Sequence, residues 1–292
     1  MFQNNALNKS DKKPVVITSD STCDLSPDLL ERFDIKTIPL TIIMGNERYL
    51  DGLELAPDDI YDYYYKTGNL PQTASPGIQD LYDFFKTFTQ AGFEVVHVDI
   101  SSELSTISNV ASIAAEELDG VYVIDSRSLS SGVGLLAIEA AECRDKGMSA
   151  AEIASHLNVL KYKVSASFVI DTLEFMWKGG RCSAITLLGA NVMKIKPALK
   201  LIDGKIEVVK KYRGKMEHVY RHYIREELMK KKIRPGHIFI TETGEISDDV
   251  LDELEKLVKS KTKGVEFHHT RAGCTVTSHC GPGTLGVLFI EE

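Results

Sequence analysis

The sequence predicts an α/β protein with two domains, a small parallel α/β/α sheet domain and a larger α/β domain with a mostly antiparallel sheet. In the first half, short apolar runs alternate with helix-forming segments, which is typical of a parallel sheet covered by helices on both faces. In the second half, Asp203-Gly204 between two apolar runs indicates a tight hairpin, and hairpins join antiparallel strands. We place the N-terminal domain at residues 1–160 and the C-terminal domain at 161–292.

Each element of the first half has a local signal. Residues 15–17 form an apolar run typical of a buried strand, and Ser26-Pro27-Asp28 combines a helix cap, a first-turn proline and an acidic residue. Further strands are expected at 37–43, 94–100 and 121–124. Further helices are expected after Pro57, after the cap-and-proline pair Ser75-Pro76, around 111–118, around 134–146 and after Ser149.

The second half is expected to begin with a strand at 162–171 and a short helical piece that reaches Trp177. Two strands of a hairpin follow within 199–209. The remaining strands are expected at 237–242, 265–269 and 284–290, and amphipathic helices at 216–230 and 248–259.

Composition and charge narrow the class of protein. The chain has 292 residues, 43% of them hydrophobic and 26% charged, a balance that excludes disordered and collagen-like chains. Its 34 basic and 42 acidic residues give a net charge of −8, so we expect no nucleic-acid partner. The five cysteines form no C-x-x-C pair, and neither a signal peptide nor a membrane-spanning stretch is apparent. We therefore expect a cytoplasmic protein without a cofactor and without stable membrane insertion.

Two segments of the first half combine hydroxyl side chains with a predicted helix start. Thr73-Ala74-Ser75-Pro76-Gly77 precedes one helix, and residues 101–106 follow a strand and precede another. Backbone N–H groups at helix N-termini attract anions, and a hydroxyl adds a donor without adding charge. On the pattern alone, the simpler interpretation is that Ser75, Ser102 or Ser105 merely caps a helix, and both interpretations stay open.

The second half contributes a cation and a histidine. In Lys178-Gly179-Gly180-Arg181 the glycines allow a sharp bend, so that the guanidinium can reach inward for an anion; a solvated surface turn is the alternative. His279 precedes Gly281-Pro282-Gly283, which lacks the ending of a phosphate-binding loop. A single histidine is more often structural than catalytic.

Metal and thiol chemistry are the remaining candidates. His268, His269, Cys274, His279 and Cys280 lie in one region, but no pair has the short spacing of a zinc site, so we predict no metal. Cys182 beside Arg181 has no identifiable base. A metal- or thiol-dependent hydrolase is therefore a minor alternative.

A series of short motifs runs in order from Val15 to the C-terminus. The motifs are residues 18–25, Ile38-Pro39-Leu40, Thr73-Ala74-Ser75-Pro76, residues 100–105, Ile124-Asp125-Ser126, Lys178-Gly179-Gly180-Arg181, residues 193–197 and residues 279–283. Together they resemble the DegV family, the fatty-acid-binding subunits of bacterial fatty acid kinases.

The resemblance implies that a long-chain fatty acid lies between the two domains, with its tail in the core and its carboxylate near the junction. Thr73 and Ser105 would donate hydrogen bonds to the carboxylate, and Arg181 and His279 would lie close to it. The sequence departs from the family at Thr106 and Ile107, which replace a glycine and a threonine. The bulkier Thr106 is expected to shift this loop and weaken the role of Ser105.

The resemblance also implies that the chain is not an enzyme. A separate kinase would use ATP to phosphorylate the carboxylate that this subunit presents. The basic run at 210–215 is a candidate contact for it, and a solvated charged stretch is the alternative. The alternative is a substrate-binding subunit for a small-molecule, dihydroxyacetone-like phosphotransfer system. That alternative predicts a short polar pocket and a histidine that holds the substrate covalently.

Overall fold

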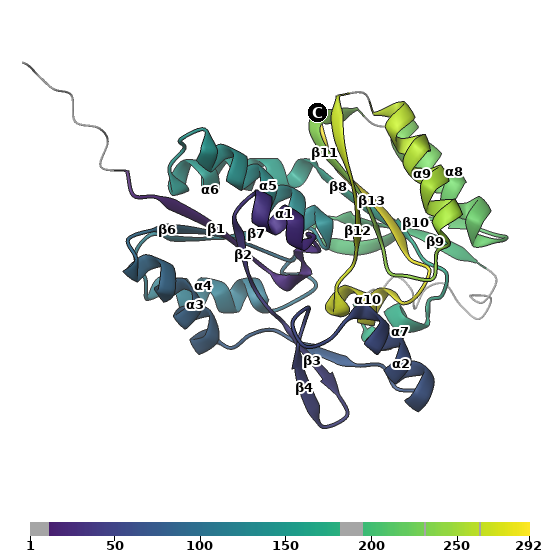
Figure 1. The fold of residues 1–292 in the computed structure, drawn as a ribbon, viewed down its shortest axis with the longest axis horizontal. Coiled ribbons are helices and arrows are strands. Elements are labelled where there is room, and N and C mark those ends of the chain that lie inside the picture. The colour runs from purple at the N-terminus through teal and green to yellow at the C-terminus, as the bar shows by residue number, and fades with distance from the viewer. Residues whose placement is uncertain (1–11, 182–194, 231, 263) are drawn as a thin grey trace, which may run out of the picture.

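The computed structural model describes residues 12–181, 195–230, 232–262 and 264–292. These residues form a four-stranded sheet, a six-stranded sheet and a small three-stranded sheet, with helices packed between and around them (Figure 1). The helices are α1 (Pro27–Arg32), α2 (Pro57–Thr67), α3 (Ile78–Gln90), α4 (Ile107–Glu116), α5 (Ser131–Asp145), α6 (Ala150–Leu160), α7 (Glu174–Gly179), α8 (Met216–Lys230), α9 (Asp248–Lys261) and α10 (Cys274–Cys280), with 3-10 turns at Ser21–Cys23 and Lys161–Lys163. No helix within these ranges is both long and apolar enough to span a bilayer.

The four-stranded sheet is parallel, as predicted. Its strands are β1 (Val15–Asp20), β2 (Ile35–Ile38), β6 (Glu94–Asp99) and β7 (Val121–Asp125), in the order β2-β1-β6-β7. Helices α3 and α4 cover one face and helices α5 and α6 the other (Figure 1). Because both faces are covered, β1 and β6 are buried along almost their whole length, with apolar residues first and polar residues such as Asp20 and Asp99 at their carboxyl ends.

The six-stranded sheet is mostly antiparallel, as predicted. Its strands are β8 (Val164–Val169), β9 (Lys196–Ile202), β10 (Lys205–Tyr212), β11 (Ile233–Glu242), β12 (Val265–Arg271) and β13 (Leu285–Glu291). The order is β10-β9-β8-β13-β11-β12, and only the β11–β12 pair is parallel. The predicted hairpin joins β9 to β10, with φ of 49° at Asp203 and 82° at Gly204, the positive values that a type I′ turn requires.

Helix α5 lies between the two large sheets. It contacts β1 and β6 on one side and β8, β11 and β13 on the other, so most of its residues are buried. A Cβ atom at Gly134 would lie 2.8 Å from the carbonyl oxygen of Cys23, so only glycine allows this close approach. One hydrophobic core therefore includes residues of both sheets, and the predicted boundary at 160/161 stays a prediction.

Two predicted elements were wrong in detail. The strand predicted at 37–43 is two strands, β2 and β3 (Thr41–Met44), which belong to different sheets. Pro39 between them has no N–H to donate, so a continuous ladder is interrupted there. Strand β3 pairs with β4 (Glu47–Leu50) and β5 (Gln72–Ala74), which the sequence analysis missed because both are short and largely polar.

The helix predicted to open at Ser75-Pro76 begins later, at Ile78. Gly77 is its N-cap, and the Gly77 N–H donates to Asp80 Oδ2 at 2.9 Å. Because Asp80 accepts the hydrogen bond from the N-cap residue, Ser75 does not cap α3. The Ser75 hydroxyl can therefore make other hydrogen bonds.

Candidate functional site

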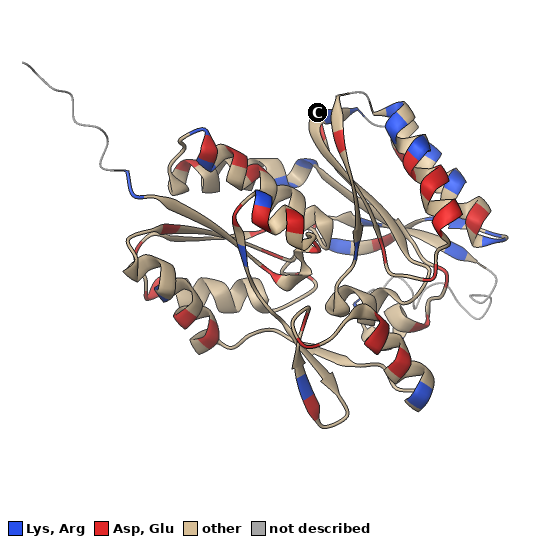
Figure 2. Ribbon diagram, in the orientation of Figure 1, with Lys and Arg blue, Asp and Glu red and all other residues tan. Residues whose placement is uncertain are grey.

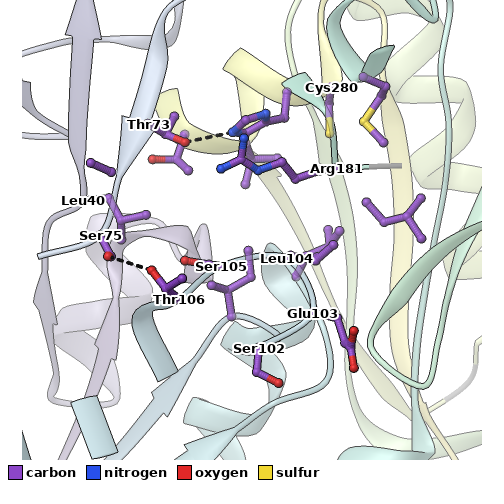
Figure 3. A pocket seen from close by; sticks show the side chains of 18 residues that line it. Leu40, Thr73, Ser75, Ser102, Glu103, Leu104, Ser105, Thr106, Arg181 and Cys280 are labelled. Atoms are coloured by element: carbon purple, nitrogen blue, oxygen red, sulfur yellow. Dashed lines mark hydrogen bonds between the residues drawn. The ribbon is translucent and has the colours of Figure 1, made fainter. Parts of the chain in front are cut away.

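A cavity of about 460 Å³ lies where the parallel sheet, the three-stranded sheet, α7 and α10 meet (Figure 3). It is lined by Leu40, Thr73, Ala74, Ser75, Ile100, Ser102, Glu103, Leu104, Ser105, Thr106, Leu129, Met176, Arg181, Ile206, Thr275, Val276, His279 and Cys280. The volume is in the range of small-molecule sites, about 300 to 1,000 Å³. All four predicted site residues, Thr73, Ser105, Arg181 and His279, line this one cavity.

The polar end of the cavity centres on Thr73 and His279. Thr73, in β5, places its Oγ1 atom 2.9 Å from Nε2 of His279, in the last turn of α10 (Figure 3). His279 Nδ1 is buried and has no hydrogen-bond partner among the described residues. Burial and, to a smaller extent, the nearby Arg181 guanidinium lower the pKa of His279 to about 4. The imidazole is therefore neutral at pH 7.

The two glycines before Arg181 have separate structural reasons. Gly180 ends α7 with a φ of 68°, in the left-handed region that favours glycine. A Cβ atom at Gly179 would lie 2.6 Å from Nδ1 of His279, so a side chain there would displace the imidazole. Arg181 follows, exposed, and its Nη1 atom donates to the Gly179 carbonyl at 2.8 Å.

The loop that carries Ser105 accommodates Thr106 without strain. Thr106 has φ −83° and ψ −5°, a conformation open to any residue, and its Oγ1 atom lies 3.2 Å from Oγ of Ser75 (Figure 3). Ser105 Oγ accepts a hydrogen bond from the Ile107 N–H at 3.3 Å and so retains its own proton for a ligand. Ser102, by contrast, donates to Asp125 Oδ2 at 2.6 Å.

Two buried carboxyl groups accept hydrogen bonds at the N-terminus of α10. Asp51 Oδ1 accepts from the Cys274 N–H at 2.9 Å, and Asp51 Oδ2 accepts from the Thr275 hydroxyl at 2.6 Å. Asp24 Oδ1 accepts from the Gly273 N–H at 2.8 Å, while burial raises the pKa of Asp24 to about 8. Neither α10 nor the role of Asp51 was predicted from the sequence. The partners of Asp51 are more than 200 residues away along the chain.

The apolar side of the cavity was also missed. Its wall is formed mainly by Leu104, Leu129, Met176, Ile206 and Val276. These residues come from separate segments, so no local pattern in the sequence connects them. A smaller cavity of about 20 Å³ shares Leu129, Val276 and Cys280 with this wall and is otherwise lined mostly by core residues of the six-stranded sheet. The apolar side therefore borders the protein core.

The other chemically reactive candidates do not gather around this cavity. His268 and His269 are on β12 and do not line it. Cys280 lines it, but burial raises the pKa of the Cys280 thiol to about 12, so a thiolate is disfavoured at neutral pH. Cys182 and residues 193–194 of the motif at 193–197 lie outside the described residues.

The fold is that of a two-sheet α/β protein, with a cavity where the parallel sheet, the three-stranded sheet, α7 and α10 meet. A family model described as "Uncharacterised protein, DegV family" matches residues 14–292. The chain belongs to the DegV family. A DegV domain-containing protein of Clostridium perfringens is 28% identical over 281 residues, which are 95% of this chain and 99% of that protein.

Solved structures of DegV proteins share the whole fold. A fatty-acid-binding DegV family protein from Thermus thermophilus superposes with a TM-score of 0.86 at 26% identity, covering 96% of this chain and all of that one. DegV of Bacillus subtilis, a fatty acid binding protein, gives a TM-score of 0.83 at 25% identity, with the same coverage.

The lowered pKa of His279 makes its contribution to stability depend on pH. Unfolding raises this pKa from about 4 to about 6.5, so the unfolded state binds the extra proton and stability falls as the pH drops from 7 toward 4. The unfolding free energy of the wild type, relative to that of His279→Gln, should decrease by about 2 kcal/mol between pH 7 and pH 5.

Urea denaturation of both proteins at each pH measures this difference in unfolding free energy. The titration of Asp24 is common to both proteins and cancels. The variant His218→Gln, at an exposed position, controls for the loss of an imidazole. If the difference in unfolding free energy between the wild type and His279→Gln is the same at pH 7 and pH 5, the His279 imidazole is solvated and its pKa is not lowered.

Proposed function

We propose that this protein binds a long-chain fatty acid in the cavity and presents the carboxylate to a separate ATP-dependent fatty acid kinase. One observation carries the proposal: a single cavity joins a polar end of hydroxyls, a neutral imidazole and a guanidinium to an apolar wall that borders the core. Membership of the DegV family supports it, as do the fatty-acid-binding relatives from T. thermophilus and B. subtilis.

The proposed carboxylate contacts follow from the hydrogen bond between Thr73 and His279. A neutral imidazole carries one N–H, and if this is on Nε2 it donates to Thr73 Oγ1, so the threonine hydroxyl is left to donate to the ligand. Ser105 donates from the opposite loop. Arg181, exposed at the rim, balances the ligand charge without occupying the cavity.

Tail burial would supply most of the affinity. Each buried methylene is worth about 0.8 kcal/mol, so about fifteen of them contribute up to roughly 12 kcal/mol. A hydrogen bond to a charged acceptor contributes about 1.5 to 3 kcal/mol. The polar cluster therefore sets the orientation of the ligand more than its affinity. An apolar wall of this kind does not favour a dihydroxyacetone-like substrate, which needs a short polar pocket.

The proposed carboxylate position can also be approached from outside. A second, polar cavity of about 710 Å³ shares Thr73, Arg181 and His279 with the first, and it is bordered by Tyr63, Gln72 and Lys178 among others. This groove is where we expect the kinase to bring ATP, so that the carboxylate oxygen attacks the γ-phosphorus and ADP leaves.

The basic run at 210–215 is a weaker candidate for the kinase contact. Lys210 forms an ion pair with Glu226 and lies over the ring of Tyr212, at 4.8 Å from its centroid. Elsewhere, Figure 2 shows the acidic residues of α9 toward its start and the basic residues toward its end.

Removing either proposed donor should weaken binding of the acid. Thr73→Val and Ser105→Ala should each lower the affinity for a fatty acid by about 1 to 3 kcal/mol, because a charged acceptor loses a donor. Since both hydroxyls share one carboxylate, a double-mutant cycle by calorimetry should show coupling between them. Ser102→Ala, in the same cavity but bonded to Asp125, is the matched control.

A fatty alcohol of equal tail length separates charge from packing. Its affinity should change little in Thr73→Val and Ser105→Ala if the hydroxyls bind a carboxylate. Equal losses for the alcohol and the acid would place the carboxylate elsewhere in the protein.

Arg181→Ala should affect phosphorylation more than binding. A guanidinium beside the carboxylate stabilises the charge that develops during phosphoryl transfer, so acyl phosphate formation with a bacterial fatty acid kinase should fall by roughly 10- to 100-fold. Fatty-acid affinity should change by less than about threefold, because the tail dominates it. Lys205→Ala, another exposed cation, is the control, and equal losses of binding and phosphorylation in Arg181→Ala would contradict this role.

A further inference from the structure

The parallel pair β11–β12 places two histidines and a glutamate on one face of the six-stranded sheet. In its register His237 is the partner of Glu266, and Phe239 is the partner of His268. Glu266 and His268 are two residues apart on β12, so their side chains point the same way as that of His237. None of these residues lines the proposed fatty-acid cavity.

The three side chains converge on one point. His237 Nδ1 lies 2.9 Å from His268 Nε2 and 3.7 Å from a Glu266 oxygen, and His268 Nε2 lies 3.9 Å from the other Glu266 oxygen. In a tetrahedral zinc site with bonds of about 2.0 to 2.2 Å, ligand atoms are about 3.3 to 3.6 Å apart. Small rotations of the two imidazoles would reach that spacing.

We propose that His237, His268 and Glu266 bind a zinc ion through Nδ1, Nε2 and one carboxylate oxygen. Two imidazoles and one carboxylate are a donor set that zinc accepts, with a water molecule in the fourth position. No metal was predicted here from the sequence, because the histidines and cysteines between 268 and 280 lack zinc spacing among themselves. His237 is 31 residues before His268, and only the strand register brings them together.

The surroundings orient both imidazoles for this role. His237 Nε2 lies 3.2 Å from Glu142 Oε1, on α5. This carboxylate keeps the proton on Nε2, so the lone pair of Nδ1 points toward the site, as in many histidine-ligated metal centres. His268 stacks on Phe239 with ring centroids 4.7 Å apart.

Arg32 competes for the carboxylate. Arg32 is the last residue of α1, and both of its terminal nitrogens donate hydrogen bonds to the Glu266 carboxylate. The distance from Nη2 to Oε2 is 3.0 Å. A carboxylate has lone pairs for an arginine and a metal ion together, but the adjacent positive charge lowers the affinity for a cation. Removing this charge should therefore strengthen zinc binding, an effect that a merely structural His–His hydrogen bond does not predict.

Calorimetric titration of the full chain with zinc chloride, after treatment with a chelator and dialysis, tests the proposal. The wild type should bind one zinc ion at this site. His268→Gln should lose about 100-fold or more in affinity, and Glu142→Gln about 10- to 100-fold. His269→Gln, an exposed position next along the same strand, should bind as the wild type does. Arg32→Gln should bind several-fold more tightly.

Absence of zinc binding in the wild type, or equal binding in His268→Gln and the wild type, would overturn the proposal. If His268→Gln does not fold, zinc binding by Glu266→Gln tests the proposal in its place. The Glu266 side chain is 43% exposed, so its substitution does not disturb the core. Magnesium chloride should give no binding heat, because magnesium prefers all-oxygen sites. Since the zinc site shares no residue with the cavity, fatty-acid binding succeeds or fails independently of it.

Discussion

The position of the site depends on the hydrogen bonds that Asp51 and Asp24 make to the start of α10. A helix N-terminus has unpaired N–H groups, and two buried carboxyl groups from the N-terminal half accept hydrogen bonds from the N–H groups at this one. Helix α10 carries His279, so these contacts set where the imidazole meets Thr73 of β5. The polar end of the cavity thus exists only where the two halves of the chain come together.

Helix α5 fixes the other side of the same junction. It is buried between the two large sheets, and Gly134 lets it approach the turn after β1 closely. Leu129, just before α5, forms part of the apolar wall and also borders the deeper cavity. A ligand with a polar head and an apolar tail matches this arrangement, because hydroxyls and a neutral imidazole lie at one end and core side chains at the other.

Features with a local physical cause could be predicted from the sequence. Alternating apolar runs and helix starts predicted both sheets, Asp203-Gly204 predicted the hairpin, and the motifs with Thr73, Ser105, Arg181 and His279 pointed to residues that line one cavity. Features that depend on distant contacts were missed. Asp51 and the apolar wall are examples, because their partners are far along the chain. The zinc-site residues likewise meet only through the parallel register of β11 and β12.

Native mass spectrometry of the protein, purified without added lipid from cells that contain free fatty acids, tests the central claim most directly. The account predicts a complex heavier than the bare chain by one long-chain fatty acid, with the extra mass lost on denaturation. A bare chain that also fails to take up added long-chain fatty acid would contradict the proposal that this cavity holds a lipid.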